Sequence, residues 1–327
     1  MINRRAFLGH IATTAFAAIS SSAIAQSAGK VWRVGFLSTA AGPNALVDAL
    51  RETLTKLGYV EGRNISYEYR WAAGREERVQ DLADELVRLK VDAIVTQTTF
   101  VTAAAKRATH SIPIVMLAAA NPVALGLIAS LARPGGNVTG MTTNSTETDG
   151  KRLQLLREVV PNATRVATLT WDKSPIKPYF LEQIRAAAKR LGVTIIHQEV
   201  GAPEAFAGAF AAMQKARAQG LVVQSDPFTN NHIKRIVDLA ALQRLPAIYQ
   251  SSGWINEGGL MYYGPSSIEL ARQSATYVDR ILKGAKPADL PVEEPTKYEL
   301  VINLKAAKAL GLSIPQSILL QATQVIK

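Results

Sequence analysis

The 327-residue chain contains no cysteine, which excludes a disulfide framework, a catalytic thiolate and a lipid anchor on an N-terminal cysteine. Its four histidines are His10, His110, His197 and His232, and no two of them have the spacing of a metal-binding pair. No stretch after residue 25 has 18 consecutive apolar residues, so we expect no stable membrane insertion.

Charge is in excess of one sign but is not clustered. There are 37 Lys and Arg residues against 26 Asp and Glu residues, which gives a net charge of +11. No run of five basic residues occurs, and basic and aromatic residues do not alternate as they do in proteins that bind single-stranded nucleic acids. We therefore expect a dispersed basic surface and no nucleic-acid partner.

The common catalytic motifs are also missing. No Gly-x-Gly-x-x-Gly follows a predicted strand, and neither a P-loop nor a Gly-x-Ser-x-Gly elbow occurs. Pro134–Asn137 resembles a phosphate loop, but it precedes a strand rather than a helix and so predicts a tight turn. The carboxylate pairs Glu76-Glu77 and Glu293-Glu294 fall at a helix start and in a linker. We expect a binding protein without cofactor or metal rather than an enzyme.

The N-terminus has the order of features found in signal peptides. Arg4 and Arg5 precede an uncharged run over residues 11–18, which leads to Ala23-Ile24-Ala25. A basic start, a short apolar run and an Ala-x-Ala site predict a signal peptide over residues 1–25 and a periplasmic location. Its removal lowers the net charge to +9. The alternative is an amphipathic N-terminal helix.

The export route has two candidates. Arg4-Arg5-Ala6-Phe7-Leu8 resembles a twin-arginine signal, which carries folded proteins. Asn3 stands where Ser or Thr is usual, and Gly9 stands where Lys is common. The general secretory route therefore stays open.

The rest of the chain alternates short β-prone runs with segments of helical period. This alternation predicts an α/β fold in which a parallel sheet is covered by helices on both faces. In the first half we expect strands at Trp32–Leu37, Asn64–Arg70, Ala93–Thr96 and Ile112–Leu117, and helices at Asn44–Leu57 and Arg75–Lys90.

The same order of segments then recurs, at offsets between 127 and 134 residues. The duplication predicts two similar lobes, although chance matching of generic strand–helix patterns is the alternative. The matching pairs are Arg33–Ser38 with Arg165–Thr170, Leu57-Gly58 with Leu191-Gly192, Val95–Thr98 with Val222–Ser225, and Ser111–Val115 with Arg244–Ile248.

Three polar or proline-rich segments are expected to join the lobes, because the elements after each of them fit the other lobe. They are Thr142–Glu147, Ser251–Gly259 and Pro287–Pro295. We expect the strand Leu260–Tyr263 and the helix Ser266–Lys283 to complete the first lobe, and Tyr298–Leu310 to return to the second. Three connections between two lobes favour a hinge that closes on a ligand. The predicted boundaries are 26–141 plus 254–288 for the first lobe and 142–253 plus 289–327 for the second, with a ligand cleft between them.

Candidate ligand contacts lie at the predicted carboxyl ends of strands, where open parallel sheets bind their ligands. Hydroxyls at strand-to-helix turns suit a carboxylate, although each of them is as well suited to capping a helix. Trp171 and Tyr263 are candidates to stack on an apolar or aromatic ligand, and core packing is the alternative for both. The full candidate set is Ser38, Thr39, Thr98, Thr99, Asn121, Thr142, Thr143, Trp171, Asp226 and Tyr263.

Four segments of the chain carry a family resemblance, namely Gly58–Ile65 with Tyr69–Ala72, Ser130–Gly140, Gly258–Ser266 and Pro291–Lys305. They resemble the uncharacterised ABC-transporter substrate-binding proteins, a family that includes tryptophan- and tyrosine-binding components. The resemblance implies a type I periplasmic-binding-protein fold, with two Rossmann-like (flavodoxin-like) lobes joined by a three-strand hinge. It also implies delivery of a solute to an ABC permease and its ATPase.

One departure from the family bears on the ligand. Many relatives carry Asp-Pro-Val where this chain has Asn121-Pro122-Val123, and Asn supplies no charge for a ligand ammonium. We expect an aromatic amino acid, an aromatic acid or another small carboxylate as ligand, and a monomeric protein. The alternatives are a sensory input protein for a membrane receptor and, less favoured, an exported α/β enzyme.

Overall fold

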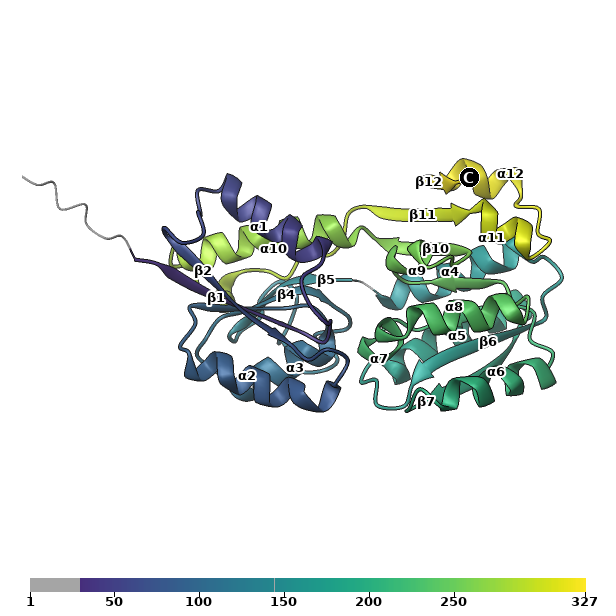
Figure 1. The fold of residues 1–327 in the computed structure, drawn as a ribbon, viewed down its shortest axis with the longest axis horizontal. Helices are drawn as coiled ribbons and strands as arrows, with labels where there is room; N and C mark the ends of the chain where they lie inside the picture. The colour runs from purple at the N-terminus through teal and green to yellow at the C-terminus, as the bar shows by residue number, and fades with distance from the viewer. Residues whose placement is uncertain (1–29, 144) are drawn as a thin grey trace, which may run out of the picture. The chain divides into compact units, whose positions relative to one another are not determined.

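The computed structural model describes residues 30–143 and 145–327, together with the backbone but not the side chains of residues 145–147. The predicted signal peptide over residues 1–25 lies outside the described residues. From Val31 onward the chain contains two β-sheets, each covered by helices on both faces (Figure 1). Within the described ranges, no helix has both the length and the apolar character needed to cross a membrane.

The first sheet has five parallel strands in the order β2-β1-β3-β4-β5. Helices α1 and α10 bury one face of it, and α2 and α3 bury the other. We call this sheet with its helices the first lobe. Its elements are β1 (Trp32–Ser38), α1 (Ala45–Lys56), β2 (Ile65–Trp71), η1 (Glu76–Arg78), α2 (Val79–Arg88), β3 (Ala93–Thr96), α3 (Thr99–Ala108), β4 (Ile114–Ala119), β5 (Val138–Thr142), α10 (Ser267–Leu282) and η2 (Pro287–Asp289).

The second sheet has seven strands in the order β12-β11-β10-β9-β8-β6-β7, and β10 and β11 form its one antiparallel pair. Helices α4, α5, α11 and α12 bury one face, and α6 and α8 bury the other. This is the second lobe. Its elements are α4 (Ser145–Val159), β6 (Arg165–Trp171), α5 (Lys177–Leu191), β7 (Thr194–Val200), α6 (Ala205–Lys215), β8 (Leu221–Val223), α7 (Pro227–Asn231), α8 (Ile233–Leu242), β9 (Ala247–Tyr249), α9 (Gly253–Asn256), β10 (Met261–Pro265), β11 (Tyr298–Asn303), α11 (Leu304–Ala309), α12 (Gln316–Gln321) and β12 (Gln324–Ile326).

The two lobes share one topology. The order β2-β1-β3-β4-β5 of the first sheet recurs in the second as β7-β6-β8-β9-β10. The four sequence pairs that predict a duplication fall on matching elements, since Arg33–Ser38 lies in β1 and Arg165–Thr170 in β6. The predicted α/β fold with two parallel-sheet lobes is confirmed.

The predicted place of one strand is wrong. The strand expected to complete the first sheet is β10, and it pairs with β9 and β11 in the second sheet. The physical reason is the duplicated topology, in which the second sheet needs a fifth strand equivalent to β5. The segment expected to cross between the lobes before this strand instead contains α9, whose Trp254 packs on Tyr249 in the second core.

The lobes exchange their last helices. After β5, the fifth strand of the first sheet, the chain crosses and forms α4 on the second sheet. After β10, the fifth strand of the equivalent order in the second sheet, it crosses back and forms α10 on the first. A third connection follows Glu293, which still bridges to Met141 of β5, and leads to β11.

Local sequence signals explain several element boundaries. The Asn44 side chain accepts hydrogen bonds from the backbone N–H groups of Leu46 and Val47 and so caps α1. Helix α5 ends at Gly192, which has a left-handed φ of 65°. In β5, Gly140 has a φ of 121°, and a Cβ there would lie 2.3 Å from the carbonyl oxygen of Met116. Only glycine fits this close approach of β4 and β5 without a shift of the backbone.

Candidate functional site

A cavity of about 490 Å³ lies at the carboxyl ends of strands from both sheets. Residues after β1, β3 and β4 of the first lobe line it, as do residues after β6, β8 and β9 of the second. Its volume falls in the range of small-molecule sites, and its position is the one that open parallel sheets use for ligands.

Five of the ten predicted site residues line this cavity, namely Thr39, Thr98, Thr99, Thr143 and Asp226. Two of their hydroxyls have structural partners. The Thr98 hydroxyl accepts from the N–H of Val101 and caps α3, as the capping alternative predicts. The Thr99 hydroxyl accepts from the N–H of Ala120 at 2.7 Å and donates to its carbonyl oxygen at 3.2 Å.

The other five predicted residues are not among those that line the cavity. The Ser38 hydroxyl donates to Oε1 of Gln97, which does line it. The Thr142 hydroxyl donates to the carbonyl oxygen of Ala119 at 2.8 Å. Each of the remaining three has a role in the fold: Asn121 has a left-handed φ of 47° after β4, Trp171 lies in the second core, and Tyr263 stacks on Tyr298 with ring centroids 5.9 Å apart.

Asp226 joins the cavity wall to the start of α7. Its Oδ1 accepts from the N–H of Thr229 at 2.9 Å, and its Oδ2 accepts from the N–H of Trp171 at 3.3 Å. Burial raises the pKa of Asp226 to about 7, against the opposing effect of these hydrogen bonds. The main role of the side chain is therefore to cap α7, and Asp226 also lines the cavity.

The sequence interpretation missed Arg152, which lines the cavity from α4 with 2% of its side chain exposed. Its Nε donates to the carbonyl oxygen of Tyr263 at 2.7 Å, and its Nη1 donates to Oδ1 of Asp149. Asp149 also accepts from Nε2 of Gln250 at 2.8 Å. Burial raises the pKa of Asp149 to about 7, while the neighbouring guanidinium opposes that rise.

A signal for this pair is present in the sequence. Asp149 and Arg152 are three residues apart and continue toward Leu156 and Val159, which are both buried. A charged pair in phase with the apolar stripe of a helix faces the core rather than solvent. The other charged residues of α4 obscure this pattern.

Several buried polar atoms of the second lobe have no hydrogen-bond partner among the described residues. They include the hydroxyls of Thr170 and Ser174 and both side-chain amide atoms of Gln224. Ser174 is the one of these three residues that lines the cavity. Thr170 is the last residue but one of β6, and Gln224 directly follows the adjacent strand β8, where its N–H donates to the Leu169 carbonyl oxygen. An unpartnered buried polar group is costly, so such atoms mark places where water or a ligand binds.

The apolar part of the cavity includes Leu46, Phe100, Leu117 and Ile268 from the first lobe. Phe100, on α3, also contacts Trp171 of the second lobe edge to face, with ring centroids 5.4 Å apart. An aromatic contact of this kind between lobes places a flat apolar surface beside the polar wall.

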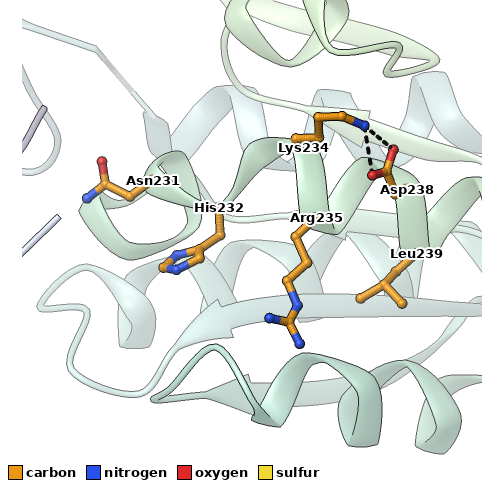
Figure 2. Close-up of a pocket in the computed structure, with 6 residues that line it drawn as sticks. All are labelled: Asn231, His232, Lys234, Arg235, Asp238 and Leu239. Carbon is orange, nitrogen blue, oxygen red and sulfur yellow. Dashed lines mark hydrogen bonds and ion pairs between the residues drawn. The ribbon is translucent and has the colours of Figure 1, made fainter. Parts of the chain in front are cut away.

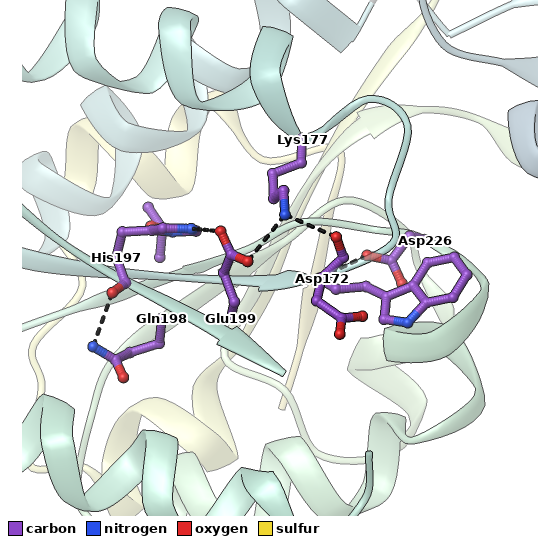
Figure 3. A network of polar contacts seen from close by, with 8 residues as sticks. Asp172, Lys177, His197, Gln198, Glu199 and Asp226 are labelled. Carbon is purple, nitrogen blue, oxygen red and sulfur yellow. Dashed lines mark hydrogen bonds and ion pairs between the residues drawn. The ribbon is translucent and has the colours of Figure 1, made fainter. Parts of the chain in front are cut away.

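The loop that carries Ser174 is held from outside the cavity by a polar network (Figure 3). Lys177 donates from Nζ to the Asp172 carbonyl oxygen at 2.8 Å and to Oε2 of Glu199 at 3.0 Å. Glu199 Oε1 lies 3.0 Å from Nε2 of His197, whose Nδ1 lies 3.0 Å from the Thr168 hydroxyl. The network fixes both ends of the β6–α5 loop.

A second hollow lies on α7 and α8, among Asn231, His232, Lys234, Arg235, Asp238 and Leu239 (Figure 2). Its charged groups have partners within the protein. Lys234 pairs with Asp238 at 2.8 Å, and the Arg235 guanidinium lies 5.8 Å from the Phe206 ring centroid. Within the described part of the chain, no group of three metal-ligating side chains occurs. The cavity between the strand ends is therefore the candidate site.

Two parallel-sheet lobes of one topology, with a cavity at the carboxyl ends of both sheets, define a type I periplasmic-binding-protein fold. The chain belongs to the family of ABC transporter substrate binding proteins, whose profile matches residues 36–326. The family resemblance found in the sequence is thereby confirmed.

Individual relatives agree with this assignment. A tyrosine-binding protein of Clostridioides difficile is 26% identical over 261 residues, which cover 80% of this chain and 75% of the relative. An ABC domain from Streptococcus pneumoniae in complex with L-Trp superposes with a TM-score of 0.84 at 24% identity, covering 91% of this chain and all of that one. A conserved domain protein from Vibrio cholerae gives a TM-score of 0.83 at 25% identity, covering 91% and 99% of the two chains.

Proposed function

We propose that this protein is the solute-binding component of an ABC importer, which captures a small solute by closure of the two lobes and delivers it to the membrane permease. The observation that carries the proposal is the cavity of about 490 Å³ at the carboxyl ends of both sheets. A cavity lined by both lobes of a fold with three connections couples ligand binding to lobe closure.

We propose an aromatic amino acid, an aromatic acid or another small carboxylate as the ligand. Phe100 and the aliphatic side chains beside it suit a flat apolar body. The hydroxyl, amide and guanidinium groups that also line the cavity suit a polar head. Tyrosine and L-tryptophan, named for two of the relatives, have both parts.

The proposed setting is the periplasm, reached through the signal peptide at residues 1–25 by the twin-arginine or the general secretory route. The proposed partners are the ABC permease and its ATPase, with the protein acting as a monomer. A fusion of residues 1–30 to a reporter separates the two routes, because a twin-arginine-deficient strain exports it only by the general one.

Thermal unfolding of residues 26–327 with a panel of solutes tests the binding function. The panel contains L-tryptophan, L-tyrosine, benzoate and other aromatic and aliphatic carboxylates, with ribose as an uncharged comparison. A ligand at a hundred times its Kd stabilises the folded state by about 2.7 kcal/mol, which raises the midpoint by several degrees. No shift with any carboxylate, together with unchanged small-angle scattering, would contradict the proposal.

A further inference from the structure

We propose that the second lobe holds the carboxylate of the ligand at a polar subsite formed by Arg152 and Ser174, an inference that rests on the proposed function. The first lobe then supplies the apolar surface against which the body of the ligand packs. Three features support this subsite: a positive charge among the cavity-lining residues, an unpartnered hydroxyl, and the contacts that fix the guanidinium.

Arg152 is the one basic side chain among the described residues that line the cavity. With 2% of its side chain exposed, it is shielded from bulk water. A guanidinium has five N–H donors, and the bonds to Tyr263 and Asp149 occupy two of them. The other three donate to no group of the described residues, and a planar guanidinium binds the two oxygens of a carboxylate in a bidentate manner.

Ser174 is a second polar residue that lines the cavity. The residue is 4% exposed, and its hydroxyl is buried with no hydrogen-bond partner among the described residues. A buried hydroxyl without a partner destabilises the protein, and a ligand in the cavity that Ser174 lines would satisfy it. In the proposed subsite, the ligand carboxylate accepts from this hydroxyl and from Arg152.

The guanidinium is held in place by groups that do not need to touch the ligand. Asp149 accepts from Nη1, and its own position is fixed by Nε2 of Gln250, while Oε1 of Gln250 accepts from the N–H of Ser225 at 3.1 Å. Asp149 and Gln250 are positioning residues in this arrangement. A buried cation with a neutralising partner is present before the ligand arrives, so binding needs no large rearrangement of charge.

The two lobes contribute different kinds of side chain to the cavity. Both charged residues described on the cavity wall, Arg152 and Asp226, belong to the second lobe. The first lobe contributes threonine, asparagine and glutamine side chains and the apolar group around Phe100 and Leu117. Asp226 is committed to the backbone of Trp171 and Thr229, which leaves Arg152 and Ser174 for the carboxylate.

The experiment compares three acids, L-tryptophan, L-tyrosine and benzoate, each with its carboxamide, by calorimetric titration of residues 26–327. The carboxamide keeps the shape of the acid and removes its charge. For the acid that binds, we expect the wild-type protein to prefer it over its amide by about 100-fold, the size of a charge-assisted hydrogen-bonded pair. In Arg152→Gln this preference is expected to fall to about threefold or less.

Ser174→Ala is the milder variant, since it removes one hydroxyl and leaves the buried ion pair intact. We expect it to weaken binding of the acid about tenfold and to narrow the preference over the amide. Arg272→Gln is the matched control, because Arg272 pairs with Glu269 at 3.6 Å outside the cavity and is half exposed. Its preference for the acid is expected to equal that of the wild type.

Arg152→Gln leaves Asp149 buried without its partner and is the variant that risks misfolding. The double variant Asp149→Asn with Arg152→Gln removes both charges, and circular dichroism checks its fold. A wild-type protein that binds an acid and its amide equally overturns the inference alone, as does an unchanged preference in the folded double variant and Ser174→Ala. Failure of all three acids and of the wider solute panel to bind overturns the proposed function itself.

Discussion

Arg152 donates a hydrogen bond from Nε to the carbonyl oxygen of Tyr263 across 2.7 Å. Arg152 lies on α4, which follows the first crossing between the lobes, and Tyr263 lies on β10, which precedes the second. The contact therefore ties the buried cation of the cavity wall to the backbone near a connection about which the lobes move in the proposed closure. A ligand that binds the guanidinium is therefore coupled to the backbone of Tyr263 through this hydrogen bond.

Replacing Phe100 tests the apolar wall. Phe100→Ala removes the ring that lines the cavity and contacts Trp171, so an aromatic ligand loses a packing surface. We expect binding of L-tryptophan or another aromatic ligand to weaken by about tenfold, equivalent to about 1.4 kcal/mol. Titration calorimetry measures this. Phe100→Leu, which keeps an apolar group, is expected to lose less, and equal affinity in Phe100→Ala and wild type would contradict the prediction.

The acidity of Asp226 predicts a pH dependence of stability. Burial raises its pKa to about 7 in the folded protein, above the value of about 4 for an unfolded aspartate. Its stabilising contribution is therefore complete below about pH 4 and is lost as the pH rises through 7. We therefore expect the free energy of unfolding of Asp226→Asn, relative to that of the wild type, to increase as the pH rises from 4 to 8. Urea unfolding at several pH values measures this difference. A constant difference across this range would be inconsistent with the raised pKa.

Glu199 predicts a dependence of the opposite sign. Hydrogen bonds from His197 and Lys177 hold the pKa of Glu199 below its usual range. Its contribution is present at neutral pH and is lost as the pH falls through the acidic range. Because the side chain is 43% exposed, we expect Glu199→Gln to cost less than about 1 kcal/mol at pH 7. Urea unfolding at pH 7 and at pH 3.5 should show that this small cost disappears on acidification, and a larger cost at the lower pH would refute it.

Two glycines predict opposite effects of one substitution. Gly140→Ala places a methyl group 2.3 Å from the Met116 carbonyl oxygen at a φ of 121°, and we expect it to destabilise the protein by about 3 kcal/mol. Gly208 lies on the exposed face of α6 with no heavy atom within 4 Å of a built Cβ. Gly208→Ala is expected to stabilise by about 1 kcal/mol, because alanine favours a helix. Denaturant midpoints measure both, and a stable Gly140→Ala would show that the two strands can separate locally.

The fold follows from the sequence wherever periodicity and duplication are strong. The strand predicted at Ala93–Thr96 agrees with the structure to the residue. The sequence did not reveal which strands pair with β10. The apolar residues of Leu260–Tyr263 suit either sheet, and only the pairing with β9 and β11 decides the place of this strand. Pairing between distant strands leaves no local mark.

The candidate site was predicted by position rather than by side chain. Strand ends pointed to the right loops, yet Ser38 and Thr142 direct their hydroxyls to neighbouring groups of the protein, while Gln97 and Ser174 line the cavity. Side chains at a strand end alternate between faces, so a shift of one residue decides which one reaches a ligand. Arg152 lies on a helix face. The rule that ligands bind at the carboxyl ends of parallel strands therefore does not identify it.

The exchange of α4 and α10 has a consequence for how the chain is made. During synthesis, the core built from β1 to β5 stays open on one side until α10 emerges more than a hundred residues later, after most of the second lobe. Contacts between segments so far apart in the sequence slow folding, and neither half of the gene encodes a lobe with a complete core. A chain truncated before Ser267 is therefore expected to leave α1 without its partner helix and to be removed by proteases rather than persist as a folded half-protein.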